Sequence, residues 1–264
     1  MFEIHDQKWF PETLRNYVTD ALQFILSLGA VYQPIVPRLS AAISSAGSAQ
    51  VVDLCSGGSG PWLWLWRTLQ QISPRGIKVC LTDKFPNISA FERAREITSG
   101  QVDFYAHSVD ATALPPGLSG FRTIFTSFHH FAPADAVAIL QNAVDQKQGI
   151  GVFEAARRCP LNIALTVLML LGGFVTAPFI RPFRWSRLFW TYLIPVIPLV
   201  LFYDGIVSCL RAYSPVELRR LIATLQPNSY HWEVGETDGG ISPITYMLGY
   251  PTGGTFLAPL SGVE

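Results

Sequence analysis

A glycine-rich turn and two acidic residues are the features of this chain best suited to chemistry. The apolar run 51–54 contains Asp53 and leads into the turn 55–60 (Cys-Ser-Gly-Gly-Ser-Gly), and Pro61 follows where a helix can begin. Glycines in such a turn let a ligand approach the backbone closely. A second acid, Asp83, follows the next strand-like run, where a carboxylate can accept hydrogen bonds from ribose hydroxyls. This spacing predicts a site for a nucleoside-containing cofactor.

The segments around this site alternate between strand-like and helix-like patterns. Strands are predicted at 51–55, 77–82, 102–106, 122–127 and 149–153, and helices at 61–72, 89–97 and 134–144. This alternation favours a mostly parallel sheet with helices on both faces. After a long interruption, a helix from Ser214 to Leu225 begins with the spacing of a capping box. Two final strands are predicted at about 230–234 and 244–248.

Two helices are predicted before the first strand. In the first, over 11–28, the residues Leu14, Val18, Leu22 and Ile25 share one face, and Gly29 ends the helix. A shorter helix covers 36–45. This N-terminal region either caps an edge of the sheet or forms a lid over the cofactor site, with Trp9 and Phe10 closing it. Both interpretations remain open at this point.

In order and in residues, the chain resembles the class I S-adenosylmethionine (SAM)-dependent methyltransferases. The likeness covers 51–154 directly and the segment after Ser214 more loosely. In that family the first strand ends in an acid and a glycine-rich turn that binds the methionine part of SAM. The resemblance implies an α/β fold with a Rossmann-like, seven-stranded, mostly parallel sheet, helices on both faces, and a hydrophobic helical insertion after the fifth strand. It also implies SAM as the cofactor.

The resemblance implies a role for individual residues at the strand ends. In the family, the acid after the second strand binds the ribose, which matches Asp83, and an acid after the third strand binds the adenine amino group, which matches Asp110. The chain departs from the commonest turn at Cys55 and Ser59, where the family usually has glycine. The expected cofactor-binding residues are Asp53, Cys55, Gly57, Gly58, Gly60, Asp83, Lys84, Phe85, Asp110, Ala111 and Ser127.

Three further residues are candidates for catalysis. Methyl transfer from a sulfonium is an in-line displacement that depends chiefly on alignment, and an oxygen or nitrogen acceptor also benefits from a base. His129 and His130 follow the fourth predicted strand, and histidine titrates near neutral pH. Glu154 ends the fifth strand at the same edge of the sheet. Alternatively, the histidines are structural and Glu154 pairs with Arg157 or Arg158.

A long apolar segment follows the fifth strand. There is no acidic residue between Glu154 and Asp204, and the runs 161–180 and 188–203 carry no charge. A run near twenty residues is long enough to cross a bilayer, although glycines and prolines interrupt both runs. The segment is therefore a transmembrane hairpin, an interfacial membrane attachment through 160–203, or a folded lid over the substrate, with or without a dimer contact. Arginine and tryptophan beside apolar helices suit the second interpretation.

Insertions after the fifth strand commonly build the substrate site in the family that this chain resembles. An apolar lid at that place implies a hydrophobic or lipid-like acceptor. The candidate substrate-binding residues are Trp185, Asp204, Arg211 and Tyr213. The expected domains are an N-terminal helical cap (1–48), a cofactor-binding core (49–155), the apolar insertion (156–213), and a C-terminal helix with a strand pair (214–264).

The composition narrows the class of protein further. The 264 residues have a formal net charge of zero, which argues against a nucleic-acid-binding surface. Hydrophobic residues make up 49% and charged residues 14%, so the chain either buries or exposes to lipid an unusual amount of apolar surface. The four cysteines have no paired spacing, and the sequence predicts no metal site. Residues 1–10 contain no apolar leader, which predicts a cytoplasmic protein at, or free of, the inner face of a membrane.

These observations predict a SAM-dependent methyltransferase that acts on an oxygen or nitrogen of a hydrophobic small molecule. Two alternatives remain. One is a non-catalytic protein that binds SAM, a membrane or a partner on the same fold, and the other is a nicotinamide-dependent oxidoreductase on a related sheet. The pair Asp83 and Asp110, together with the final strand pair, argues against the oxidoreductase.

Overall fold

A seven-stranded sheet forms the centre of the computed structural model, which describes residues 1–72, 76–226, 230–237 and 242–252. The strand order is β3-β2-β1-β4-β5-β7-β6. The strands are β1 (Gln50–Leu54), β2 (Lys78–Leu81), β3 (Val102–Phe104), β4 (Phe121–Phe125), β5 (Ile150–Glu154), β6 (Tyr230–Thr237) and β7 (Ile244–Pro251). The first five are parallel, and β7 runs antiparallel between β5 and β6. The predicted seven-stranded, mostly parallel sheet is confirmed.

The strand order places a ligand site beside β1. This strand pairs with β2 on one side and with β4 on the other, so successive crossovers leave it in opposite directions. In open α/β sheets such a switch point opens a crevice at the carboxyl ends of the strands. The glycine-rich turn that follows β1 lies at this point.

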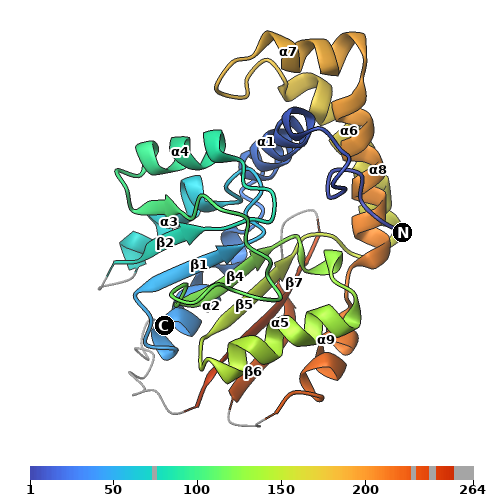
Figure 1. Ribbon diagram of the computed structural model, residues 1–264. Helices are drawn as coiled ribbons and strands as arrows, with labels where there is room; N and C mark the ends of the chain where they lie inside the picture. The colour runs from blue at the N-terminus through green and yellow to red at the C-terminus, as the bar shows by residue number, and fades with distance from the viewer. Residues whose placement is uncertain (73–75, 227–229, 238–241, 253–264) are drawn as a thin grey trace, which may run out of the picture.

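Helices cover both faces of the sheet, as Figure 1 shows. On one face lie α2 (Val36–Ser45), α3 (Trp62–Ile72) and α4 (Ile88–Ile97), and on the other α5 (Pro133–Asp145) and α9 (Pro215–Ile222). Neighbouring residues of β1 belong to different cores, because Val51 packs on the first face and Val52 on the second. Two hydrophobic cores therefore fix the sheet between the helices.

The apolar segment forms a helical unit together with α1 (Glu12–Leu28). The apolar segment itself contains α6 (Pro160–Thr176), α7 (Trp185–Leu188), a π-helix (Phe189–Leu193) and α8 (Val196–Arg211). A third cluster joins Leu14 and Val18 of α1 to Val200 and Leu201 of α8. In Figure 1, α1, α6 and α8 stand together at one end of the sheet, and α7 lies farthest from it.

A buried arginine links the insertion to α1. Arg187 is fully buried, donates to the carbonyl oxygen of Ile180 at 2.8 Å, and donates to Asp20 Oδ2 at 3.3 Å. Asp20 also accepts a hydrogen bond from Asn87, which caps α4, at 2.9 Å. These polar contacts connect the insertion, α1 and the Rossmann-like core.

The apolar segment contains no single helix that satisfies the length and hydropathy of a membrane span, and neither does any other part of the described ranges. The segments Trp185–Leu193 and Val196–Arg211 satisfy them together, but their axes bend by 69° at the break between them.

Most predicted boundaries agree with the observed ones within two residues, and two differences have clear causes. The fourth strand ends at Phe125 because Thr126 has a φ of 42°, which turns the chain into the short 3-10 helix Phe128–His130. The helix after Ser214 ends at Ile222, since the next residues form tighter three-residue turns. Its predicted capping box is confirmed, with reciprocal hydrogen bonds between Ser214 and Glu217.

Candidate active site

The turn after β1 keeps a glycine-like backbone although two of its residues are not glycine. The φ values are 57° at Cys55, 52° at Gly57, 81° at Ser59 and 52° at Gly60. Side chains other than hydrogen are disfavoured in this left-handed region. Cys55 and Ser59 therefore adopt the conformation that glycine has at lower cost, and the sequence difference leaves the path of the turn intact.

Helix α1 packs directly on this turn. A Cβ atom on Gly58 would lie 2.6 Å from the carbonyl oxygen of Thr19, so no side chain fits between the turn and the helix. The N-terminal helix thus covers the strand ends, which favours the interpretation of this region as a lid over the site.

Asp53 supports the turn through hydrogen bonds of its buried carboxylate. Its side chain is 1% exposed, and its two carboxylate oxygens accept hydrogen bonds from Thr123 Oγ1 at 2.6 Å and from Ser56 Oγ at 2.7 Å. Burial raises the pKa of this carboxyl group from 3.8 to about 6, against the effect of these hydrogen bonds. Asp53 therefore connects the turn to β4.

The raised pKa of Asp53 predicts a particular dependence of stability on pH. Because the folded pKa exceeds the unfolded one, folding favours the protonated form, and stability is lost as pH rises from about 4 to about 6. This group should contribute a loss of about 3 kcal/mol in the free energy of unfolding over that range. Urea denaturation at several pH values, compared with Asp53→Asn, measures this contribution. Equal pH slopes in the two proteins would contradict it.

Asp83 joins the turn to the loop after β2. Its Oδ2 accepts a hydrogen bond from the backbone amide of Gly57 at 2.8 Å, and its Oδ1 accepts one from the amide of Phe85 at 2.8 Å. Burial raises the pKa of Asp83, which these amide hydrogen bonds oppose. The carboxylate is therefore fixed in orientation, and each oxygen still has a lone pair for a ligand hydroxyl.

Asp110 lies in the loop after β3, on the rim that the strand-end loops form around one cavity. It accepts hydrogen bonds from the hydroxyl of Thr112 at 2.7 Å and from its amide at 3.0 Å, and it pairs with Lys84 Nζ at 3.0 Å. The Thr112 hydrogen bonds and the Lys84 cation hold the pKa of Asp110 at about 2. The ion pair connects the loops after β2 and β3.

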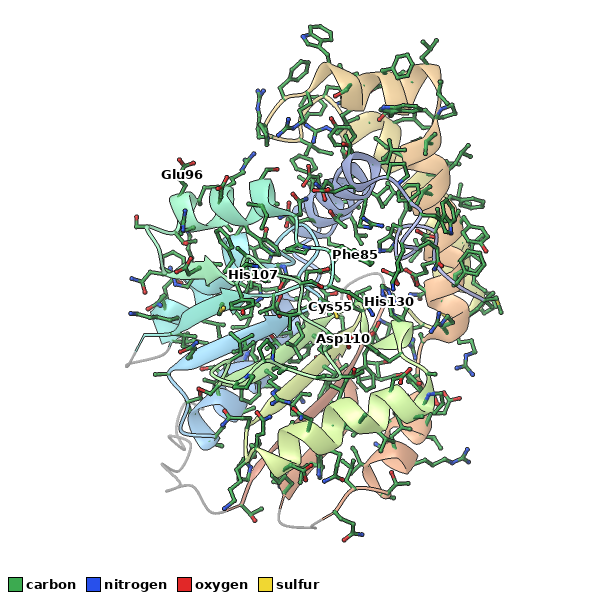
Figure 2. The ribbon with its side chains drawn as sticks, in the orientation of Figure 1. Cys55, Phe85, Glu96, His107, Asp110 and His130 are labelled. Atoms are coloured by element: carbon green, nitrogen blue, oxygen red, sulfur yellow. The ribbon has the colours of Figure 1, made fainter. Side chains whose placement is uncertain are left out.

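All predicted cofactor-binding residues line one cavity of about 1080 Å³. Figure 2 shows Cys55, Phe85, Asp110 and His130 gathered near the middle of the molecule, at the carboxyl edge of the sheet, and places Glu96 elsewhere. The cavity continues away from the strand ends to a wall of apolar side chains. That wall comes from α1 and the insertion, and it includes Val18, Leu22, Ile25, Leu165, Met169 and Leu201.

The two predicted histidines differ in their surroundings. His130 lines the cavity, whereas His129 is 1% exposed and does not. His129 Nδ1 lies 2.8 Å from Glu154 Oε2, and the other oxygen of Glu154 accepts hydrogen bonds from the amides of Phe128 and His129. Burial lowers the pKa of His129, but the contacts with the Glu154 and Glu3 carboxylates together raise it above its ordinary value. Glu154 and His129 thus form a buried pair behind the cavity wall.

The N-terminal segment supplies residues that the sequence interpretation did not identify. Glu3, His5 and Asp6 line the cavity. Glu3 Oε2 lies 3.1 Å from His130 Nε2, and Asp6 Oδ2 lies 2.8 Å from His130 Nδ1. Glu3 is 2% exposed, whereas the side chains of His130 and Asp6 are 17% and 36% exposed, so this polar cluster is partly buried. The presence of Glu3, His5 and Asp6 within four positions of a chain with few charges was the one signal in the sequence.

One of the four predicted substrate-binding residues lies on the cavity wall. Asp204 lines the cavity, and its carboxylate accepts the amide of Ile4 at 2.7 Å. Arg211 donates to the carbonyl oxygen of His130 at 2.6 Å, and Tyr213 donates to that of Phe131 at 2.9 Å, so both fix the loop after β4. Trp185 is 78% exposed at the far end of the insertion.

The alternative pairing of Glu154 with a nearby arginine is not what the structure shows. Arg157 pairs with Glu236 at 2.7 Å, and Arg158 pairs with Glu217 at 3.3 Å. Both arginines thus connect the end of β5 to the C-terminal helix and strand pair. All four cysteines are free thiols.

Comparison with known proteins gives a likeness of fold. No family model matches the chain, and no curated protein matches its sequence. A solved structure from Nostoc punctiforme PCC 73102, proposed to be an O-methyltransferase, superposes with a TM-score of 0.50 at 12% identity, over 89% of this chain and 59% of that one. The chain has a Rossmann-like methyltransferase fold. Its seven-stranded sheet and helical surround match this solved structure.

Two other solved structures align over most of both chains. Magnesium protoporphyrin IX methyltransferase from Synechocystis PCC 6803, with S-adenosylhomocysteine (SAH) bound, has a TM-score of 0.48 at 15% identity and covers 84% of each chain. The plantazolicin methyltransferase, also with SAH bound, has a TM-score of 0.49 at 10% identity, over 91% of this chain and 96% of that one.

Proposed function

We propose that this chain is a SAM-dependent methyltransferase that methylates an oxygen or nitrogen atom of a hydrophobic, lipid-like small molecule. The main support is that one cavity joins the strand-end residues Asp83 and Asp110 to apolar side chains of α1 and α6. Ligand cavities usually measure about 300–1,000 Å³. A cavity of about 1080 Å³ has room for a cofactor and an acceptor together.

The residues at the strand ends fit SAM. The fixed carboxylate of Asp83 suits a ribose diol, and Asp110 lies farther along the rim, where it suits an amino group that donates hydrogen bonds. The left-handed turn 55–60 offers a backbone that a ligand can approach closely. When bound, SAM supplies a methyl group on a positively charged sulfur.

Different residues of this chain then have different tasks. Asp83 and the turn bind and orient the donor, and the apolar walls of α1 and α6 bind the acceptor and exclude water. Of the predicted catalytic residues, His130 lies on the wall, in contact with Glu3 and Asp6, so we assign proton acceptance to this cluster. We assign a positioning role to His129 and Glu154, which are buried behind it.

Calorimetric titration with SAH tests the proposed cofactor directly. We expect saturable binding of one SAH per chain, and no binding of a nicotinamide dinucleotide. Binding of SAH without methylation of any hydrophobic acceptor would favour the non-catalytic alternative. No binding of SAH by the folded chain would exclude the methyltransferase.

We also propose that the tip of the insertion, residues 175–194, contacts an anionic lipid surface. Its exposed apolar side chains are Val175, Phe179, Phe183, Trp185, Phe189, Tyr192, Leu193 and Ile194. Arg181 and Arg184 are exposed between them, and no acidic residue lies within the tip. This combination of exposed aromatic, aliphatic and cationic groups suits a headgroup region.

The position of the tip supports a lipid-like acceptor. Figure 1 shows α7 at the end of the molecule farthest from the sheet, with α6 and α8 leading from it toward the strand ends. Helix α6 has exposed apolar residues such as Leu171 and Val175, while Leu165 and Met169 of the same helix line the cavity. One helix therefore separates the cavity from the surface that we assign to lipid.

A further inference from the structure

We propose that Glu3, His5 and His130 bind a divalent first-row transition-metal ion at the cavity wall. One ligand atom from each of the three lies within 4.8 Å of the others. Glu3 Oε2 is 3.1 Å from His130 Nε2 and 3.8 Å from His5 Nδ1. Because bonds from nitrogen and oxygen to zinc measure about 2.0–2.2 Å, tetrahedral ligands lie about 3.3 Å apart. The three atoms therefore need only small movements to share an ion.

For two of the three ligands, hydrogen bonds behind the residue leave the right lone pair free. His130 Nδ1 lies 2.8 Å from Asp6 Oδ2, so this nitrogen donates its proton to Asp6 while Nε2 faces Glu3. A carboxylate that orients a histidine in this way is the usual support of a metal ligand. Glu3 is supported too, because its Oε1 lies 3.1 Å from His129 Nε2 and accepts the Ser208 hydroxyl at 2.9 Å. Its Oε2 remains for the ion.

Asp204 places the third ligand. Its Oδ1 accepts the amide of Ile4 at 2.7 Å, and its Oδ2 lies 2.7 Å from His5 Nδ1. Asp204 thus fixes the segment that contains Glu3 and His5 against α8. An ion would replace the proton that His5 Nδ1 shares with this Oδ2 atom.

The charges around the cluster favour a cation. Four carboxylates, from Glu3, Asp6, Glu154 and Asp204, lie in contact with three histidines. Three of these carboxylates are 4% exposed or less, so water screens them poorly. A divalent ion neutralises this excess directly. Without a metal ion, protonation of the histidines would neutralise the negative charge. The experiment must distinguish this protonated state from metal binding.

The ligand set indicates the class of metal. Imidazole nitrogens with carboxylate oxygens suit Zn²⁺, Co²⁺, Ni²⁺ and Mn²⁺, whereas Mg²⁺ and Ca²⁺ prefer oxygen ligands alone. An ion at this wall would face the part of the cavity that we assign to the acceptor. There it would lower the pKa of a bound hydroxyl, and this would take the place of proton acceptance by His130. That role rests on the proposed function, but the binding of the ion does not.

Metal titration of the chain without SAM or SAH tests the site by itself. We expect untagged protein, stripped with a chelator, to bind one Zn²⁺ per chain in calorimetry, far more tightly than Mg²⁺. Bound Co²⁺ should show visible absorption without a thiolate charge-transfer band, which excludes Cys55 as a ligand. His130→Gln and His5→Gln should each weaken Zn²⁺ binding at least about tenfold.

The control is His107→Gln, because His107 is exposed and does not line the cavity, and Figure 2 shows it away from His130. This variant should bind Zn²⁺ as the natural chain does. Circular dichroism and the melting temperature of each variant check that it is folded, and the Co²⁺ spectrum requires no variant. Zn²⁺ binding no tighter than that of Mg²⁺, or equal loss in all three variants, would overturn the proposal. SAH binding can succeed or fail independently of either result.

Discussion

Asp83→Asn is expected to lower the affinity for SAH at least about a hundredfold. A hydrogen bond to a charged group contributes about 1.5–3 kcal/mol, and a ribose diol can donate two of them to this carboxylate. The loss of about 3 kcal/mol corresponds to a factor of about one hundred. The amide also cannot accept both hydrogen bonds that Asp83 receives from Gly57 and Phe85, so the turn itself should shift. Calorimetry with SAH measures the change.

Asp103→Asn is the matched control for this experiment. Asp103 lies on the neighbouring strand β3, its side chain is 61% exposed, and it does not line the cavity. This change removes the same charge and should leave the SAH affinity unaltered. If Asp83→Asn binds SAH as the natural chain does while its melting temperature is unchanged, then Asp83 does not bind the ribose.

The sequence predicts that the strand-end residues meet at one cavity, for a physical reason. Strand patterns are local, and the carboxyl ends of parallel strands meet at one edge of a sheet. Asp53 is the second-last residue of β1, and Asp83 and Asp110 follow β2 and β3, so their spacing along the chain determines where they lie in space. The turn conformation at Cys55 and Ser59 was harder to predict, because neither residue is glycine although both have a positive φ.

The polar cluster was not predictable in the same way. Glu3 contacts His129 although 126 positions separate them, and no local pattern encodes such a pairing. It depends on how the segment before α1 returns across the cavity to α8. The same limit explains Arg211 and Tyr213, which lie at the end of the insertion in sequence but bond to the loop after β4 and do not line the cavity.

The insertion shows what an apolar pattern leaves open. Its composition predicted an apolar element but did not indicate which side of α6 lies toward the cavity. Nearly every residue of α6 is apolar, and the orientation of a helix is read from where its polar residues lie. The structure divides the helix. Leu165 and Met169 line the cavity, while Leu171 and Val175 are exposed. The structure was therefore needed to show which apolar side chains of α6 line the cavity, and on these we base the proposed acceptor.

The double change Trp185→Glu and Leu193→Glu is expected to abolish binding to anionic vesicles. These side chains are 78% and 72% exposed, so the change should not disturb folding. Transfer of each large apolar side chain from water contributes about 2 kcal/mol, so losing both weakens binding at least about a hundredfold. Co-sedimentation with vesicles of phosphatidylglycerol and phosphatidylcholine measures it. Binding of the natural chain should also weaken at high salt, because Arg181 and Arg184 contribute by charge.

The pair Ile72→Glu and Ile97→Glu is the matched control, since both residues are exposed apolar side chains of the core, on α3 and α4. It adds the same charge and should leave vesicle binding unchanged. Light scattering decides between a lipid surface and a second copy of the chain as the partner of the tip. A natural chain that is dimeric, that fails to bind vesicles, and that becomes monomeric with the tip changes would contradict the membrane contact. Loss of vesicle binding from a chain of unaltered mass would establish that the tip binds lipid, and the search for the acceptor would begin among membrane-soluble molecules.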